Sequence, residues 1–246
     1  MAFVATASTQ LTHAYALGMD TTSNTAVLFD FGGTLDADGL AWKERVYRLF
    51  RDEGVAVERA RFDPLFHAAD DALVGTLSPT TSFDATVARL VAAVAAALGL
   101  ADPRMTARLA RRFVDDALGH LGDNVPLLRR LARRARLGIV SNFYGNLARV
   151  CEDAKIRPLF SVLVDSAEVG CAKPEPRIFL HALAALGLGP ADATFVGDSL
   201  PRDMAGARAV GMRHIWLVSE AAPAQDPCCR GDRVIHSLKD LEGLLL

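Results

Sequence analysis

Short apolar runs alternate with helical stretches along most of the chain, and this order constrains the fold more than any other feature. Six runs have the composition of buried strands, at 26–30, 137–141, 161–165, 193–197, 213–218 and 233–235. Helical periodicity separates or follows the later strands, near 126–135, 143–154, 175–186, 201–210 and 237–244. Strands separated by helices favour parallel pairing with right-handed crossovers. We therefore expect an α/β fold with a doubly wound, Rossmann-like parallel sheet.

A gap in this alternation predicts a second, helical unit. Between 39 and 121 the sequence has no convincing strand, and its helical periodicity lies at 40–54, 63–75, 83–99 and 103–119. The resulting division is an N-terminal extension at 1–24, an α/β core at 25–38 and 122–246, and an inserted helical cap at 39–121. Because the insert directly follows the first strand, it would lie over the carboxyl ends of the strands. A lid that closes on a small substrate is the favoured interpretation, and a structural subdomain is the alternative.

Composition and charge exclude few functions. The 246 residues are 51% hydrophobic with a net charge of −2, which gives no support for nucleic-acid binding. No apolar run has the length of a membrane-spanning helix, and residues 1–24 lack the regions of a signal peptide. The four cysteines lack zinc-ligand spacing, which favours a reducing, cytoplasmic setting; they are Cys151, Cys171, Cys228 and Cys229. Oligomeric state and the choice of Met1 or Met19 as the start are left open.

Polar residues lie at or just past the ends of several predicted strands, where ligands bind in open α/β sheets. They are Asp30 in Asp-Phe-Gly-Gly-Thr, the pair Ser141 and Asn142, Lys173 in Gly-x-x-Lys-Pro, and Asp198 with Asp203. Taken singly, each is as well explained as a turn residue, helix cap or surface charge. Together they suit phosphoryl transfer, which needs carboxylates for magnesium and donors for phosphate oxygens. Those donors would be Thr34, Ser141, Asn142 and Lys173.

These four motifs, in this order, resemble those of the haloacid dehalogenase-like (HAD) superfamily, and the resemblance covers residues 26–240. The helical insert resembles the C1 cap of subfamily I. The resemblance implies that Asp30 is a nucleophile that forms a covalent aspartyl intermediate. It also implies that Thr34, Ser141 and Lys173 bind the transferring group. The magnesium ligands that it implies are Asp30, Asp198, Asp203 and the backbone carbonyl of Gly32.

Gly32 departs from the pattern of the family's phosphatases, which carry a second Asp two residues after the nucleophile. That Asp protonates the leaving group and then activates water. Losing such a general acid/base typically lowers the rate about 10²–10⁴-fold. Aryl and acyl phosphates, which leave without a proton, should therefore suffer least. Asp36, Asp38, Asp70 and Asp71 could replace it, although solvated turn and helix carboxylates are the simpler interpretation.

The leading hypothesis is a magnesium-dependent hydrolase acting on a small phosphorylated metabolite. A phosphate-binding protein that has lost efficient turnover, and acts through conformation or a partner, is the alternative that Gly32 motivates. A haloacid dehalogenase, which uses no magnesium, agrees poorly with retention of both Asp198 and Asp203. A phosphonatase-type enzyme would need a cap lysine, and Lys43 is the one that the insert contains. Specificity is expected from cap residues around Trp42, Arg45, Phe66 and His67, and His120 could also face substrate.

Overall fold

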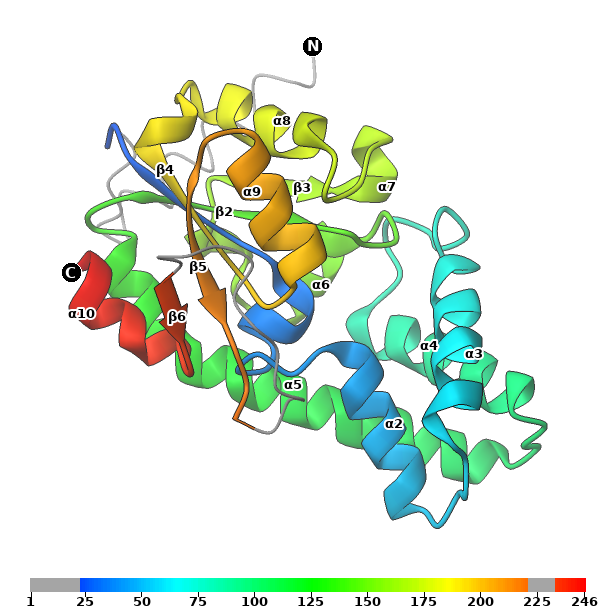
Figure 1. The fold of residues 1–246 in the computed structure, drawn as a ribbon. Helices are drawn as coiled ribbons and strands as arrows, with labels where there is room; N and C mark the ends of the chain where they lie inside the picture. Colours follow the sequence, from blue (N-terminus) through cyan, green and yellow to red (C-terminus); the bar gives the residue numbers. More distant parts are fainter. Residues whose placement is uncertain (1–22, 221–232) are drawn as a thin grey trace.

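The computed structural model describes residues 23–220 and 233–246, so the predicted extension, Cys228 and Cys229 lie largely or wholly outside the described residues. Within them, a six-stranded sheet has the order β3-β2-β1-β4-β5-β6 (Figure 1). Every neighbouring pair is parallel. The strands are β1 (Ala26–Phe29), β2 (Arg136–Ser141), β3 (Val162–Asp165), β4 (Ala193–Gly197), β5 (Arg213–Leu217) and β6 (Arg233–Ile235). The predicted Rossmann-like parallel sheet is confirmed, and each strand ends within one residue of its expected position.

The central strand β1 determines where a ligand can bind. It pairs with β2 on one side and β4 on the other, and Phe29 lies opposite both Ile139 and Val196. The chain runs outward from β1 to β3 and then returns to β4 on the other side. The strand order therefore reverses between β1 and β4, and open α/β sheets bind ligands at this point, beyond the carboxyl ends.

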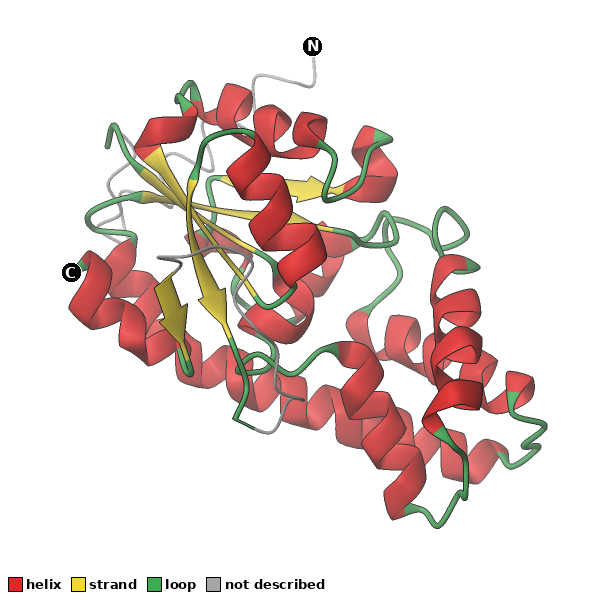
Figure 2. Ribbon diagram, viewed as in Figure 1, coloured by secondary structure: helices red, strands yellow, loops and turns green. Residues whose placement is uncertain are grey.

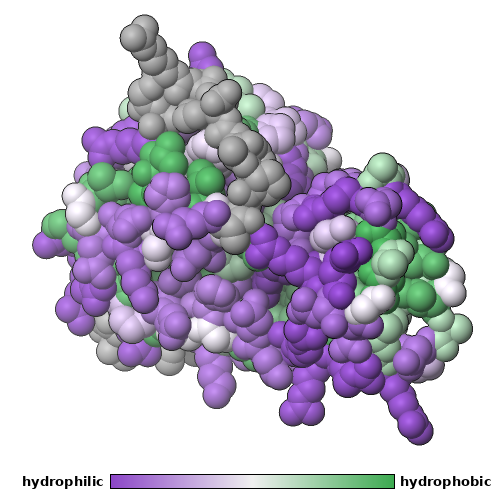
Figure 3. All heavy atoms as spheres, turned by 60° about the horizontal axis from the view of Figure 1, so that its bottom comes forward, coloured by the Kyte–Doolittle hydropathy of each residue, from purple (hydrophilic) through white to green (hydrophobic). Residues whose placement is uncertain are grey.

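Helices cover both faces of the sheet (Figure 2). Alternation along β1 directs Val27 and Phe29 into one apolar core and Ala26 and Leu28 into the other. The core-covering helices are α6 (Leu147–Asp153), α7 (Ser166–Val169), α8 (Pro176–Leu186), α9 (Ala205–Ala209) and α10 (Glu242–Leu245). Figure 3 shows that hydrophilic side chains cover most of one face of the molecule, as expected when apolar side chains fill the two cores.

The segment after β1 is helical, as the periodicity predicts. Its helices are α2 (Trp42–Asp52), α3 (Arg59–Asp71), α4 (Phe83–Ala97) and α5 (Pro103–Leu131). Figure 1 shows α2, α3 and α4 grouped to one side of the sheet, with α5 running from them back beneath it. Within the described residues, no helix is both long enough and apolar enough to cross a membrane.

Helix α5 corrects one expectation. The sequence suggested separate helices at 103–119 and 126–135, with Pro126 near the start of the second, but one helix runs through both and contains Pro126. Leu121, Leu127 and Leu128 are all buried, so the apolar face continues past the proline. Packing of that face outweighs the hydrogen bond that proline cannot donate.

Candidate active site

Asp30 lies at the carboxyl end of β1, beside the point where the strand order reverses. Its backbone N–H donates to the carbonyl of Val196 on β4 at 2.9 Å, which fixes the start of the loop. Gly33 follows with φ +95°, a conformation that favours glycine. A Cβ atom there would lie 2.7 Å from Oδ2 of Asp198. The glycine therefore lets this loop approach the carboxylate that follows β4.

Three carboxylates converge at this point. Asp30, Asp198 and Asp203 each offer an oxygen, and these oxygens lie within 4.8 Å of one another. Gly197 makes room for the group, since a Cβ there would be 2.5 Å from Oδ2 of Asp203. Burial, followed by the charges of Asp30 and Asp203, raises the pKa of Asp198 well above its usual value. Carboxylates held this close suit a hard divalent cation, which prefers oxygen ligands.

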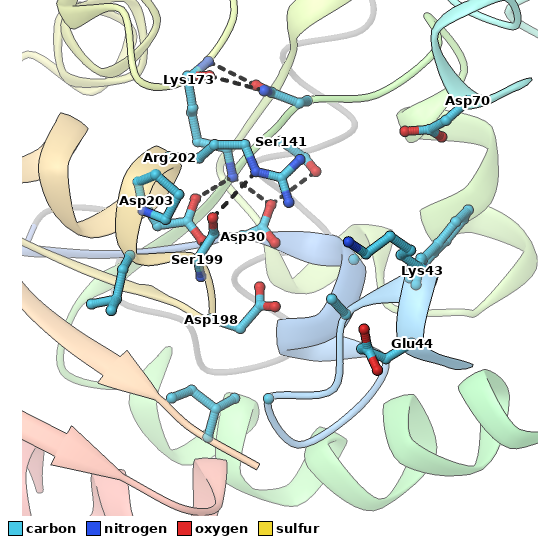
Figure 4. A pocket seen from close by; sticks show the side chains of 18 of the residues that line it. Asp30, Lys43, Glu44, Asp70, Ser141, Lys173, Asp198, Ser199, Arg202 and Asp203 are labelled. Atoms are coloured by element: carbon cyan, nitrogen blue, oxygen red, sulfur yellow. Dashed lines mark hydrogen bonds and ion pairs between the residues drawn. The ribbon is translucent and has the colours of Figure 1, made fainter. Parts of the chain in front are cut away.

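Lys173 supplies a positive charge to the same group. Its Nζ lies 2.5 Å from Oδ1 of Asp30 and 2.7 Å from Oδ1 of Asp203 (Figure 4). Burial lowers the pKa of Lys173, but the charges of these two carboxylates outweigh burial and raise it overall. Ser141 Oγ also donates to Oδ1 of Asp30, at 3.0 Å. Two donors thus hold one oxygen of Asp30 and fix its carboxylate plane.

The side chains of Asn142 and Thr34 were expected to bind an anion, but in the structure their polar atoms bind other protein groups. Asn142 Nδ2 donates to the Lys173 carbonyl at 3.0 Å, and its Oδ1 accepts from the Lys173 N–H at 2.7 Å. The Asn142 side chain therefore positions Lys173. Thr34 is fully buried, and its hydroxyl donates to Oδ1 of Asp198 at 3.2 Å. Their local side-chain hydrogen bonds could not be inferred from strand-end positions.

Trp42 occupies the space beside Gly32. A Cβ atom on Gly32 would lie 3.1 Å from the indole Nε1 of Trp42, although the backbone there (φ −78°, ψ 111°) would accept any L-residue. The indole is held in place, because Nε1 donates to Oδ2 of Asp36 at 2.7 Å. An aromatic wall therefore lies where the side chain of the family's second aspartate would begin.

Asp36 is neither a solvated turn carboxylate nor a free acid, which corrects both interpretations from the sequence. It is fully buried and accepts from Trp42, from the Gly33 N–H at 2.7 Å and from Arg45 Nη1 at 2.8 Å. Arg45 is buried as well and also pairs with Asp116 on α5, at 2.9 Å. Arg45 does not line the cavity, contrary to its expected role in specificity.

The other proposed substitute acids differ in position. Asp70, on α3, lines the cavity and accepts a hydrogen bond from the Tyr144 hydroxyl. Burial is the main cause that raises the pKa of Asp70 above its usual value. Asp71 is exposed, and Asp38 faces Ser237 and the Leu238 N–H at 3.5 and 3.4 Å. Of these carboxylates, Asp70 alone borders the cavity.

The cavity has a volume of about 690 Å³ and lies between the sheet and the inserted helices. The carboxylates, Ser141 and Lys173 line its core side, while the insert contributes Trp42, Lys43, Glu44, Arg59, Asp63, Phe66, His67 and Asp70. Trp42, Phe66 and His67 therefore lie where the sequence suggested, whereas His120 does not line the cavity. Tyr144 and Arg202 were missed, because nothing in their spacing distinguishes them from ordinary loop residues.

The chain belongs to the haloacid dehalogenase-like hydrolases, because residues 25–211 match that family. Among curated proteins, it is 41% identical over 115 residues to haloacid dehalogenase-like hydrolase domain-containing protein 3 of Bos taurus, covering 46% of this chain and 45% of that protein. It is 39% identical over 82 residues to phosphoserine phosphatase of Thermus thermophilus, covering 33% and 32% of the two chains. The matched segments thus span less than half of either relative.

A solved structure shares the fold. The HAD-hydrolase YfnB of Bacillus subtilis, solved bound to magnesium, aligns with a TM-score of 0.57 over 91% of this chain and 99% of that chain. Its sequence identity of 21% makes this a similarity of fold. The alignment nevertheless extends over the sheet and the inserted helices together.

Proposed function

We propose that this protein is a magnesium-dependent phosphohydrolase that acts on a small phosphorylated metabolite through an aspartyl phosphate on Asp30. The observation that carries the proposal is the meeting of three carboxylates, two buried and one half-buried, with Lys173 at one cavity. Magnesium would be held by Asp30, Asp198, Asp203 and the Gly32 carbonyl, and would neutralise charge on the phosphoryl group when bound. The all-oxygen donor set supports that ion over a softer metal.

The chain's own residues suit the first chemical step. The Asp30 carboxylate attacks phosphorus, a new O–P bond forms, and the bond to the leaving oxygen breaks with its electron pair. Lys173 and Ser141 orient Asp30 and can donate to phosphoryl oxygens as charge builds. Water then attacks phosphorus, the bond between Asp30 and phosphorus breaks with its electron pair on the carboxylate, and the inorganic phosphate that leaves carries the water's oxygen and protons. The inserted helices, which form one wall of the cavity, would limit competing contact with bulk water.

Proton transfer distinguishes the expected substrates. Gly32 offers no proton to the leaving oxygen, so aryl and acyl phosphates should be turned over most readily. An alkyl phosphate needs an acid, and we propose Asp70 as its source, because it borders the cavity and its pKa is raised by burial. Asp36 is excluded from this role, since its carboxylate is enclosed by Gly33, Trp42 and Arg45.

The proposal is tested by measuring phosphate release from p-nitrophenyl phosphate and acetyl phosphate, with magnesium and with EDTA. We expect magnesium-dependent turnover that Asp30→Asn abolishes. Mass spectrometry of the wild-type protein quenched in acid should locate phosphate on Asp30. Absence of release from a broad panel of phosphate esters and acyl phosphates would contradict the proposal.

The position of the Trp42 side chain beside Gly32 supports a second candidate function, that of a phosphate-binding protein without efficient turnover. The indole occupies space that a general acid/base would use, so binding can persist while hydrolysis is slow. Under this alternative, inorganic phosphate binds the magnesium-loaded protein in calorimetry, but no substrate is hydrolysed. Accumulation of phosphorylated Asp30 without release would indicate a block in the second step.

A further inference from the structure

Most charged side chains around the cavity have an opposite charge beside them. Lys43 lies 2.9 Å from Asp63, and Arg59 forms an ion pair with Glu44. On the core side, Lys173 contacts two carboxylates. These groups largely neutralise one another, and a substrate that bound them would have to displace an existing partner.

Arg202 is different. It lines the cavity from the turn that follows β4, and its side chain is exposed. Among the described residues, no carboxylate lies within 4.0 Å of its guanidinium, and its Nε donates a hydrogen bond to Ser199 Oγ at 3.3 Å. Both terminal nitrogens are therefore available to a ligand. Figure 4 shows Arg202 on the core side of the cavity, with Asp70 and Lys43 across from it.

With a cation in the metal site, the positive charge of Arg202 has no carboxylate charge of that site left to balance it. A divalent cation together with Lys173 would balance the three carboxylates of Asp30, Asp198 and Asp203. Arg202 interacts electrostatically with Asp203, Asp30 and Asp198, and less strongly with Asp70 of the insert, so its charge acts on both sides of the cavity. Asp30 and Lys173 are buried, whereas Arg202 is exposed. A group bound by Arg202 would therefore lie farther out than the transferring phosphoryl group.

We propose that Arg202 binds a second acidic group of the substrate, a carboxylate or a second phosphate, separate from the phosphoryl group that is transferred. The inference rests on the proposed function and narrows its substrate class to small metabolites with two acidic groups. A guanidinium presents paired donors that match the oxygens of either anion. The contact between Nε and Ser199 restrains the plane of the fork while leaving its outer edge open.

Binding of stable phosphonates by calorimetry tests this without requiring turnover. The probes are methylphosphonate, with one acidic group, 3-phosphonopropionate, which adds a carboxylate, and methylenediphosphonate, which adds a second phosphonate. The magnesium-loaded wild-type protein should bind at least one bis-acid probe more tightly than methylphosphonate. Arg202→Gln should weaken that bis-acid probe about 10–100-fold and change methylphosphonate less than about twofold. Which bis-acid probe is affected identifies the second group.

Two variants serve as controls. Arg202→Lys keeps the positive charge but lacks the paired N–H donors of the guanidinium, so it should bind the bis-acid probe more tightly than Arg202→Gln and less tightly than the wild type. Arg177→Gln removes an exposed arginine that pairs with Glu175 and does not line the cavity, so it should leave all three affinities unchanged. Equal weakening of methylphosphonate and the bis-acids by Arg202→Gln would overturn the proposal, since Arg202 would then serve the phosphoryl site. Bis-acid binding no tighter than methylphosphonate in the wild type would also overturn it. These binding measurements do not depend on hydrolysis. A protein that binds the probes but hydrolyses no phosphate ester would therefore contradict the proposed function and leave this inference standing.

Discussion

Gly32 and Trp42 act as a pair at the residue scale. The glycine removes the group that normally transfers the proton, and the indole lies 3.1 Å from where that group's Cβ atom would be. Trp42 also donates a hydrogen bond to the Asp36 carboxylate, which in turn accepts one from the Gly33 N–H. The glycine at 32 therefore fits the packing of Trp42 closely, and a side chain added there requires the indole to shift.

We predict that Gly32→Asp alone raises turnover of an alkyl phosphate by less than about tenfold. The introduced side chain would collide with the indole, which has little room to move. Combining it with Trp42→Leu should raise kcat/KM by a further factor of about 10–100, toward the usual contribution of a general acid/base. Steady-state kinetics of both single variants and the double variant measure this coupling. A large gain from Gly32→Asp by itself would show that Trp42 is no obstacle.

Asp36 is predicted to stabilise the fold. Asp36→Asn removes the buried carboxylate charge that pairs with Arg45 and leaves it only the exposed Asp116, so it should lower the free energy of unfolding by about 3–5 kcal/mol. Urea denaturation measures the change. Asp38→Asn is the matched control, because its contacts are long, at 3.4 and 3.5 Å, and should cost less than about 1 kcal/mol. Similar losses in the two variants would contradict this assignment.

At the scale of elements, helix α3 places the Asp70 carboxylate on the side of the cavity opposite the three carboxylates of the core (Figure 4). Asp70 faces the hydroxyl of Tyr144, with His67 and Asp71 near it on α3 and the charge of Arg202 across the cavity. Burial raises its pKa despite the opposing effects of Tyr144 and Arg202. The carboxyl group therefore retains its proton to a higher pH than an exposed aspartate does.

Asp70→Asn should lower kcat/KM for an alkyl phosphate about 100-fold and change that for p-nitrophenyl phosphate little, because the aryl oxide leaves without a proton. In the wild type, the alkyl rate should fall as pH rises through the raised pKa of Asp70, since the acid is lost. The variant should lack that decline. Asp71→Asn, at the exposed neighbouring position, is the control. Equal losses on both substrates would assign Asp70 to binding instead.

The sequence was sufficient for the strands and for the meeting of Asp30, Asp198 and Lys173, because strand ends in a parallel sheet share one edge. It was not sufficient for α5, where packing of a continuous apolar face outweighed the local signal of Pro126. It also could not distinguish Asp36 from Asp70. Asp36 lies in a turn and Asp70 on a helix, and their difference in burial depends on contacts from distant segments.

At the scale of the whole molecule, folding brings like charges together before any cation is bound. Asp30 follows β1 and the other two carboxylates follow β4, so assembling the sheet forces the three oxygens within 4.8 Å of one another. Lys173 offsets part of this repulsion. The folded state should therefore be less stable without a metal than its cores would otherwise allow, and a bound cation should restore that stability.

Asp198→Asn tests this link between stability and metal binding. The amide preserves an oxygen for the Thr34 hydroxyl and removes one of three like charges held close together, so in EDTA the variant should melt at a higher temperature than the wild type. Magnesium at about 100 times its dissociation constant should stabilise the wild type by about 2.7 kcal/mol, because the ion binds only the folded chain. The variant, with one ligand weakened, should gain much less. Thermal unfolding with and without magnesium measures both effects, and Asp192→Asn, an exposed position before β4, controls for the loss of one carboxylate. Equal stabilisation of wild type and Asp198→Asn by magnesium would mean that the ion binds elsewhere, and the proposed metal site would have to be abandoned.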